Sequence, residues 1–550
     1  MSLLRRTALL LFCVTVLYGL WWESSASDAR WLSLLLGGWL LLVVAFWPRL
    51  PAGTSTVNRT VLRTATLLAS VFAVLSIQLV RLQVVQSRAT VRRVGTDAMS
   101  NEVIANPRLQ LDDLTIHRGS VFDRHGAVLA ETTVSEGTAR RRYPDPESGY
   151  LVGYFSPLLY GKTGLEQRYD AELTGRDGTN AVLRGLDDLL GRALRGLDLH
   201  LTLDAELQRS AHRLLAGRTG GAVLLGVSTG DVLAMASTPS FDPNQLFTSS
   251  AGERDAAAQY WATLLDDAAL PLVNRATSGR YTPGSTFKVV TAAAAIDAGF
   301  ATPDDPYTDN GQLDVGGHII NEYNRPDDTR DSWTLREGLA WSLNVVFAQI
   351  GLELGPDVMA DYARRFGFDD AAPFDLPTVP SQVASTPDFL DSLPGLADTG
   401  FGQGELLATP LEMALVAAGL ANGGVILVPR LVATIADSTG RTIRTIEPSV
   451  WKQPVSGATS KVMVDLMVNN VVNGVAQAAT ISGFVVGGKT GTAEVPEGDP
   501  HAWFIGFAGA TEPVYAVAVV LEHGGTGLSS SLGIGRELLA AALERSSLPA

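Results

Sequence analysis

The chain has 550 residues, which is too long for one ordinary domain and predicts two or three folded units. Its composition is that of a globular protein, because 46% of the residues are hydrophobic and 18% are charged, without a low-complexity tract. The formal net charge of −15 argues against a nucleic-acid partner, and the single cysteine, Cys13, excludes an internal disulfide and a cysteine-ligated metal site.

Three apolar segments crowd the first 82 residues and predict up to three transmembrane helices, at about 7–22, 31–47 and 64–82. The gap between the second and third segments is rich in arginine, whereas the gap between the first and second is acidic and rich in serine. The positive-inside rule therefore predicts a cytoplasmic N-terminus, with everything after residue 82 outside. A secretory signal peptide is the competing interpretation of the first segment, but no small-residue cleavage site follows it cleanly.

The segment 83–198 is polar, rich in arginine and broken by proline and glycine, with short strand-like runs. From residue 199 to the C-terminus, helical patterns alternate with pairs of strand-like runs. Two of these pairs predict hairpins, namely 221–225 with 232–237 and 503–507 with 514–521. Hairpins with intervening helices predict an α+β fold in which helices cover an antiparallel sheet.

Two catalytic motifs in this part of the chain stand in the wrong context. Ser228 lies in a Gly-x-Ser-x-Gly string typical of a hydrolase nucleophile, but a strand follows where that motif needs a helix. Residues 483–490 match the phosphate-binding P-loop letter by letter, but glycine, threonines and an early proline follow the lysine, which is a poor helix start. We therefore disfavour both a hydrolase of the elbow type and a nucleotide-binding protein.

A third pattern is an ordered set of three motifs: Ser285-Thr286-Phe287-Lys288, Ser342-Leu343-Asn344 and Lys489-Thr490-Gly491. Their order is the S-x-x-K, S-x-N, K-T-G arrangement of serine enzymes that recognise penicillin. Each motif alone is weak evidence, but the set uses two of only five lysines in the chain. The ordered triple predicts a nucleophilic serine site.

The chemistry explains why these residues belong together. Ser285 is expected in the first turn of a helix, so that Lys288 lies on the same face within hydrogen-bond reach of its hydroxyl. Lys288 acts as a base only when neutral, which burial and a nearby cation, Lys489, would favour. The N–H groups at the helix start, with a second N–H from the strand of Lys489, would stabilise an oxyanion. The alternative is that Ser285 is only a helix cap and Lys288 a solvated residue.

The remaining candidate residues have roles in the same scheme. Ser342 would relay protons between Lys288 and the leaving group, and Asn344 would bond the substrate amide, although both are also good helix caps. Substrate backbone and a terminal carboxylate would bind along a strand edge formed by Lys489, Thr490, Gly491 and Thr492. No metal-binding spacing of histidines occurs, so we predict neither a metal nor a cofactor and regard His117, His125, His501 and His523 as structural.

From about His117 onward the chain resembles a class B penicillin-binding protein. The resemblance rests on the three motifs and on further family-like strings, which are 118–126, 164–166, 274–276, 281–288, 402–405, 409–410 and 489–494. It implies a helix-covered antiparallel sheet of the penicillin-binding and serine β-lactamase type at 199–550. It also implies a small, β-rich, non-catalytic pedestal domain of the dimerisation type at 83–198, after an N-terminal membrane region at 1–82.

The resemblance further implies a peptidoglycan D,D-transpeptidase anchored in the bacterial plasma membrane, with its catalytic domain outside the cytoplasm. Ser285 would be acylated by the penultimate D-Ala of a stem peptide, an amine would resolve the acyl-enzyme, and β-lactams would inhibit covalently. The interval between residues 82 and 199 is too short for the glycosyltransferase domain of bifunctional class A enzymes, so an integral-membrane glycosyltransferase is the expected partner. The alternatives are a D,D-carboxypeptidase and a β-lactam sensor or scaffold without turnover.

Overall fold

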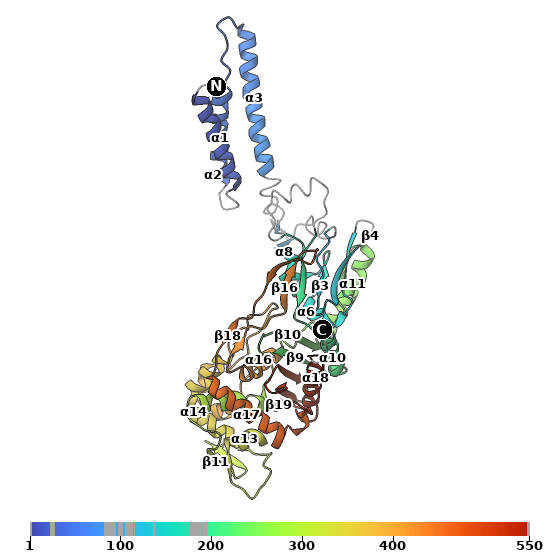
Figure 1. The fold of residues 1–550 in the computed structure, drawn as a ribbon, viewed down its shortest axis with the longest axis vertical. Coiled ribbons are helices and arrows are strands. Elements are labelled where there is room, and N and C mark those ends of the chain that lie inside the picture. Colours follow the sequence, from blue (N-terminus) through green and yellow to red (C-terminus); the bar gives the residue numbers. More distant parts are fainter. Residues whose placement is uncertain are drawn as a thin grey trace. The chain divides into compact units, whose positions relative to one another are not determined.

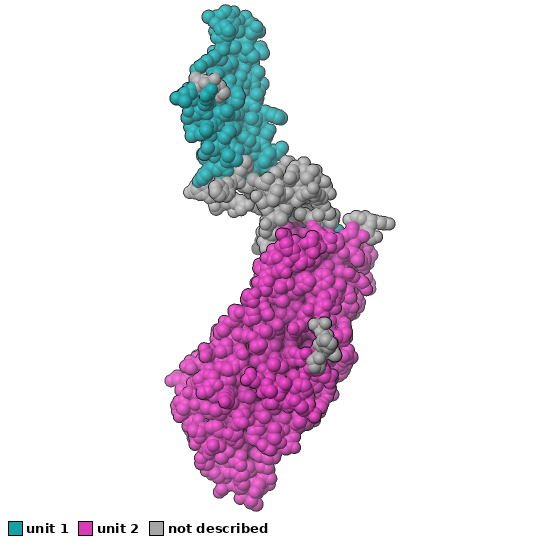
Figure 2. All heavy atoms as spheres, viewed as in Figure 1, with its two compact units in different colours: residues 1–116, 177–194 teal, residues 117–176, 195–550 magenta. Residues whose placement is uncertain are grey.

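The computed structural model describes residues 3–21, 28–81, 95–96, 103–104, 114, 116–135, 138–176 and 195–546. The chain divides into two compact units (Figure 2), of which the first comprises residues 1–116 and 177–194 and the second residues 117–176 and 195–550. The predicted start of the pedestal at residue 83 and the predicted end of the last apolar segment at residue 82 lie outside the described residues.

The first unit contains three apolar helices: α1 (Leu3–Trp21), α2 (Asp28–Phe46) and α3 (Thr56–Val80). Among the helices that the structure describes, α3 is the one that is long and apolar enough to cross a membrane, by length and composition. Trp39 on α2 donates a hydrogen bond of 2.9 Å from its indole Nε1 to Ser70 Oγ on α3. The insertion of α1 and α2, which overlap the predicted segments 7–22 and 31–47, stays a prediction. A short strand pair, β1 (Gly95–Thr96) with β2 (Val103–Ile104), completes the described part of this unit.

The second unit is built on two large sheets (Figure 1). The first has the strand order β17-β16-β8-β3-β4-β5 and is antiparallel except for the parallel pair β3–β8. Its strands are β3 (Val121–Phe122), β4 (Val128–Ser135), β5 (Thr138–Arg142), β8 (Asp198–Leu201), β16 (Val432–Ala436) and β17 (Thr442–Thr445). Two strands of this pedestal sheet thus come from the C-terminal half of the chain, and the predicted boundary at 198/199 falls inside β8.

The second sheet is five-stranded and antiparallel throughout, with the order β10-β9-β21-β20-β19. Its strands are β9 (Gly220–Gly226), β10 (Val232–Thr238), β19 (Val485–Ala493), β20 (His501–Gly509) and β21 (Tyr515–Leu521). Both predicted hairpins are confirmed, as is the helix-covered antiparallel sheet. Ser228 lies in the turn between β9 and β10, and Lys489 lies within a strand, so neither misleading motif precedes a helix.

Helices cover both faces of the five-stranded sheet, so the residues of its strands are almost all buried. Successive strand residues point to opposite faces, so Val517 and Val519 pack with α10 and α18 while Ala516 and Ala518 pack into the core of α12 and α16. These helices are α10 (Ala205–Leu215), α18 (Ser531–Ser546), α12 (Lys288–Asp297) and α16 (Pro410–Ala421). The sheet is therefore a buried central layer, and its edge strand β19 carries Lys489, Thr490, Gly491 and Thr492.

Shorter elements surround the two sheets. The remaining helices are α6 (Gly149–Val152), α7 (Gly164–Arg168), α8 (Asp170–Leu173), α11 (Ala251–Asp266), α13 (Leu335–Trp341), α14 (Asn344–Arg365), α15 (Leu393–Gly400) and α17 (Gly457–Asn473). The 3-10 turns are η2 (Pro146–Ser148), η3 (Pro243–Leu246), η4 (Gly284–Thr286), η5 (Pro387–Phe389) and η6 (Gln477–Ala479). The small strand pairs are β6 (Phe155–Ser156) with β7 (Gly161–Lys162), β11 (Pro306–Thr308) with β14 (Ser332–Thr334), β12 (Gln312–Val315) with β13 (His318–Asn321), and β15 (Ile426–Leu427) with β18 (Val450–Lys452).

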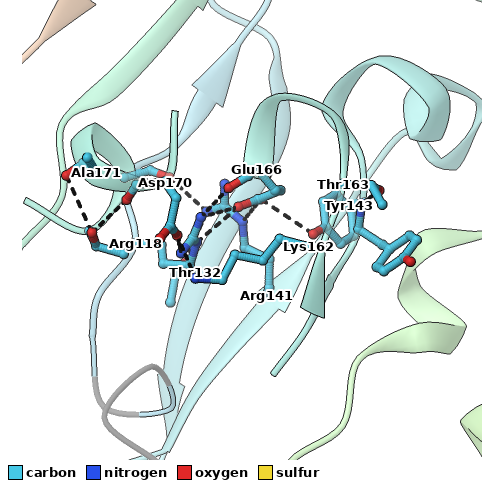
Figure 3. Close-up of polar contacts among 12 residues, drawn as sticks. Arg118, Thr132, Arg141, Tyr143, Lys162, Thr163, Glu166, Asp170 and Ala171 are labelled. Atoms are coloured by element: carbon cyan, nitrogen blue, oxygen red, sulfur yellow. Dashed lines mark hydrogen bonds and ion pairs between the residues drawn. The ribbon is translucent and has the colours of Figure 1, made fainter. Parts of the chain in front are cut away.

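A buried ion cluster holds the pedestal together (Figure 3). Glu166 on α7 is fully buried and lies 2.7 Å from Arg118 Nη2 and 2.6 Å from Arg141 Nε on β5. Arg118 also pairs with Asp170 at 2.6 Å. Burial by itself would raise the pKa of Glu166, but the two guanidinium groups outweigh burial and lower it. The cluster therefore holds together the segment before β3, the strand β5 and the short helices α7 and α8 by charge-assisted hydrogen bonds rather than by apolar contacts alone.

We expect Glu166→Gln to destabilise the second unit by about 3–5 kcal/mol, because it leaves the buried guanidinium of Arg141 without a counter-charge and that of Arg118 with Asp170 alone. Since the pKa of Glu166 is lowered on folding, its stabilisation is complete at neutral pH and is lost as the pH falls through that lowered pKa. The matched control is Glu131→Gln, which removes the partner of Arg142 in a solvent-exposed pair and should cost less than about 1 kcal/mol. Thermal unfolding of the full chain in detergent measures both, and equal effects would contradict the expectation.

Candidate active site

Ser285 lies in a tight turn that leads into α12. The turn is the 3-10 segment η4, so Ser285 precedes the α-helix rather than occupying its first turn as predicted. Gly284 has a positive φ of 54°, and a Cβ at this position would lie 2.6 Å from Thr492 O. Short 3-10 turns are frequent at the start of α-helices, and glycine here lets the strand β19 approach the turn closely.

Lys288 is completely buried one turn after Ser285. Its Nζ donates hydrogen bonds to Ser342 O at 2.6 Å and to Asn344 Oδ1 at 2.8 Å, with Ser342 Oγ at 3.4 Å. The hydrogen bonds of this amine therefore run to the S-x-N segment. The sequence had instead predicted a hydrogen bond to the Ser285 hydroxyl. The amine is held in place by fixed acceptors, next to the serine that precedes it by one turn.

The S-x-N segment joins two helices and carries backbone strain. The helix α13 begins with a capping box between Thr334 and Glu337 and ends at Ser342, which has a left-handed conformation with φ 62° and ψ 40°. This conformation costs a non-glycine residue about 1–3 kcal/mol and is found mostly at functional sites. It turns the chain so that both the carbonyl and the hydroxyl of Ser342 face Lys288, while Asn344 begins α14.

Lys489 reaches the same point from the sheet. It lies on β19, which is the edge strand of the five-stranded sheet, and its side chain is completely buried. Its Nζ donates to Ser342 Oγ at 2.8 Å and to Thr490 O at 2.9 Å. The hydroxyl of Ser342 thus lies between the two amines, and the three predicted motifs meet at this atom.

The two amines are electrostatically coupled. Burial lowers the pKa of Lys288 to about 7, and the negative charge of Glu322 opposes this shift. Burial, and then the charge of Lys288, lowers the pKa of Lys489 well below its ordinary value. We had expected Lys489 to keep Lys288 neutral; the repulsion is mutual, so the proton belongs to the pair. The arrangement supplies a neutral amine near neutral pH, which is what a general base requires.

A glycine-flanked loop supports Ser285 from the other side. Gly402 has φ 91°, and a Cβ there would lie 1.9 Å from Gly284 O, so the loop touches the backbone of the turn. Gln403 donates from Nε2 to Thr492 O at 3.4 Å. The N–H and C=O of one strand residue point to the same edge, so the N–H of Thr492 also faces the Ser285 turn. That N–H and the N–H of Ser285 are suited to stabilise an oxyanion.

Sequence reasoning assigned no role to three residues that position this site, although Gln403 lies in the family-like string 402–405. Glu322 accepts a hydrogen bond from Val345 N–H at the start of α14, and Gln403 contacts Thr492. Asn470 on α17 is buried and donates to Gly488 O, directly before Lys489, at 2.8 Å. The flanking glycines were a usable signal for Gln403, but neither Glu322 nor Asn470 lies in a recognisable motif.

The histidines that we regarded as structural lie in different parts of the second unit. The rings of His501 and His523 lie 5.1 Å apart near the end of β19, whereas His125 pairs with Asp204 in the pedestal region. Within the described residues, no group of three or more His, Cys, Asp or Glu side chains is arranged to hold a metal ion.

Comparisons with known protein families agree with this geometry. Residues 220–541 match the model described as the penicillin binding protein transpeptidase domain, and residues 118–199 match the penicillin binding protein A dimerisation domain. The peptidoglycan D,D-transpeptidase PbpA of Mycolicibacterium smegmatis is 37% identical over 466 residues, covering 80% of this chain and 92% of that protein. The protein of the same name from Mycobacterium tuberculosis is 35% identical over 459 residues, covering 80% of this chain and 91% of that protein.

Solved structures with the same fold include acylated forms. The ceftriaxone acyl-enzyme complex of penicillin-binding protein A from M. tuberculosis superimposes with a TM-score of 0.73 and 34% identity, covering 79% of this chain and 100% of that one. The PBP2 of Pseudomonas aeruginosa in complex with WCK 5153 gives a TM-score of 0.66 and 30% identity, covering 80% of this chain and 98% of that one.

We expect Gly402→Ala to destabilise the protein, because the new Cβ collides with the backbone that carries Ser285. The matched control is Gly423→Ala, where φ is also positive at 64° but no atom lies within 4 Å of the new Cβ. Both variants share the conformational strain, so Gly402→Ala should lose about 1–3 kcal/mol more than the control through overpacking. Denaturant unfolding measures the difference. Equal midpoints would mean that the backbone of the turn moves aside without a loss of stability.

Proposed function

Because this chain belongs to the class B penicillin-binding proteins, we propose that it is a peptidoglycan D,D-transpeptidase with Ser285 as its nucleophile. The observation that carries this assignment is the convergence of Lys288, Ser342 and Lys489 at one hydroxyl oxygen beside the Ser285 turn. Three segments far apart in the sequence meet there, and each supplies a group that acyl transfer needs.

The proposed reaction proceeds in two steps. In the first, neutral Lys288 takes the proton of the Ser285 hydroxyl while Oγ attacks the carbonyl carbon of the penultimate D-Ala. The N–H groups of Ser285 and Thr492 stabilise the oxyanion. The proton passes through Ser342 to the leaving nitrogen, the C–N bond breaks and terminal D-Ala departs. In the second, an amine of a neighbouring stem peptide attacks the acyl carbon and the C–Oγ bond breaks. The proton that the amine loses passes through Lys288 to Ser285 Oγ, so the cross-link forms and Ser285 is free again.

The substrate would lie along the free edge of β19. Since Asn344 Oδ1 already accepts a hydrogen bond from Lys288, its Nδ2 remains to donate to a substrate carbonyl. The edge strand segment of Lys489, Thr490, Gly491 and Thr492 would pair with the substrate backbone, as an extended peptide adds to a sheet. Lys489 and the threonine hydroxyls would bind the terminal carboxylate. β-Lactams would acylate Ser285 in the same geometry.

The proposal extends to the domains and the cell. Residues 1–82 would form the membrane region, 83–198 the pedestal and 199–550 the transpeptidase domain, with the N-terminus in the cytoplasm and the catalytic domain outside. The apolar helix α3 and the dimerisation-domain match at 118–199 support this arrangement. Glycan polymerisation would come from an integral-membrane glycosyltransferase partner, for which the support is family analogy alone.

Labelling with a fluorescent penicillin tests the nucleophile. Ser285→Ala should abolish covalent labelling of the full chain, because no acyl bond can form without the hydroxyl. Ser228→Ala is the matched control, since it removes the serine of the rival motif in the exposed turn between β9 and β10 and should be labelled like the wild type. Labelling that survives in Ser285→Ala, or that is lost in Ser228→Ala, would refute the assignment.

The products of turnover test the acceptor. When the full chain in detergent turns over a peptide ending in D-Ala-D-Ala with an acceptor amine present, we expect the amine adduct alongside free D-Ala. A D,D-carboxypeptidase would instead give only the hydrolysed peptide, because water would resolve the acyl-enzyme. A sensor or scaffold would become acylated and release neither product. Mass spectrometry distinguishes the three outcomes.

A further inference from the structure

The chain between α12 and α13 forms an arm, defined here as residues 306–334, that consists of the strand pairs β11–β14 and β12–β13. The arm is fastened to α14 by side chains from both sides. Gln349 Nε2 donates to Thr308 O at 2.8 Å, and Tyr307 OH donates to Glu353 Oε2 at 3.3 Å. Glu322 follows directly on β13, where its own N–H donates to Gly311 O at 2.9 Å. The register of the arm therefore fixes the position of Glu322.

The half-buried carboxylate of Glu322 is held by backbone amides. Oε2 accepts from Val345 N–H at 3.1 Å, and Oε1 accepts from the N–H groups of Tyr323 and Asn324 at 3.0 and 3.2 Å. In the part of the chain that the structure describes, no arginine, lysine or histidine forms an ion pair with this carboxylate. Its negative charge is thus fixed in place and is not compensated by a neighbouring cation.

That charge faces the reacting amine. Asn344 Oδ1 accepts a hydrogen bond from Lys288 Nζ at 2.8 Å, and the next residue, Val345, donates its N–H to Glu322. Glu322 and Lys288 therefore bind neighbouring residues at the start of α14. The titratable groups that face the Lys288 amine are Glu322 from the arm, whose charge raises its pKa, and Lys489 from β19, whose own pKa the charge of Lys288 lowers. The other groups around it, Ser342, Asn344 and the ring of Phe347 on α14, are uncharged.

We propose that Glu322 is a positioning residue for acylation, which orients the start of α14 through Val345 and whose charge sets the pH at which Lys288 becomes a free base. The inference rests on the proposed function, because it concerns the base that activates Ser285. A carboxylate stabilises a nearby ammonium, so Glu322 opposes the loss of the Lys288 proton that burial favours. The arm would thereby tune the base although it touches neither Ser285 nor the two amines.

A simple cap of α14 would also explain the hydrogen bond to Val345, and the pH dependence separates the two roles. Loss of a cap lowers the rate of acylation at every pH. Loss of the charge moves the acidic limb of the rate profile, because Lys288 then gives up its proton at lower pH. The pH of the acidic limb therefore reports the charge at position 322, and the rate on the plateau reports the geometry of the site.

The experiment measures the rate of acylation of the full chain by a fluorescent penicillin against pH. In Glu322→Gln, which keeps an acceptor oxygen for Val345, the limb should move to lower pH by roughly half a unit to one unit. Glu322→Asp keeps the charge and should retain the wild-type limb, with a slower plateau. The matched control is Glu353→Gln, which removes the other carboxylate that joins the arm to α14 and should leave the limb in place.

A limb in Glu322→Gln that coincides with the wild type would overturn the inference, as would a limb in Glu322→Asp that moves as far as in Glu322→Gln. Should Glu322→Gln fail to fold, Glu322→Asp decides by itself, because a displaced limb assigns the effect to geometry. Failure of the proposed function is a separate result: it is seen as wild-type protein that the penicillin does not label, or as labelling that persists in Ser285→Ala.

Discussion

Two buried amines lie within hydrogen-bonding distance of one hydroxyl group, and the fold around the five-stranded sheet holds them there. Lys288 and Lys489 are both withdrawn from water and both lie within hydrogen-bonding distance of Ser342 Oγ. Burying an ammonium is unfavourable, and burying two side by side is more so, which lowers the affinity of the pair for protons. Carbonyl and amide oxygens from the surrounding chain supply the compensating acceptors. The result is a Lys288 amine whose pKa is lowered to about 7.

Such a pair forms only where chain segments that are 54 and 147 residues apart in the sequence meet at Ser342. Three devices achieve this. The sheet fixes Lys489 on an edge strand, the left-handed conformation of Ser342 turns its polar groups inward, and α17 links the two segments. Asn470 on α17 donates a hydrogen bond to the carbonyl of Gly488, the residue that precedes Lys489. Just after α17, the N–H of Val475 donates to the carbonyl of Ala340, two residues before Ser342. Glycines let these segments approach more closely than a Cβ would allow.

The pedestal uses a different principle. Its sheet combines β3, β4, β5 and β8 with β16 and β17, which come from residues 432–445. Its core is organised around Glu166 and two arginines rather than around apolar residues alone. A buried ion cluster of this kind tolerates little displacement, because moving one member leaves a charge without its partner. The pedestal is therefore an integral part of the second unit.

The sequence by itself determined the chemistry and the fold class: the helix-covered antiparallel sheet, the two hairpins, and the motifs around Ser285, Ser342 and Lys489. These are readable because they depend on residue type and short spacing, as does the rejection of Ser228, which a local strand pattern decides. Only the tertiary structure decided that Lys288 bonds the S-x-N segment rather than Ser285, that β16 and β17 belong to the pedestal sheet, and that Glu322, Gln403 and Asn470 surround the site. The physical reason is that these are contacts between distant segments, fixed by packing, register and backbone conformation, and no local pattern records them.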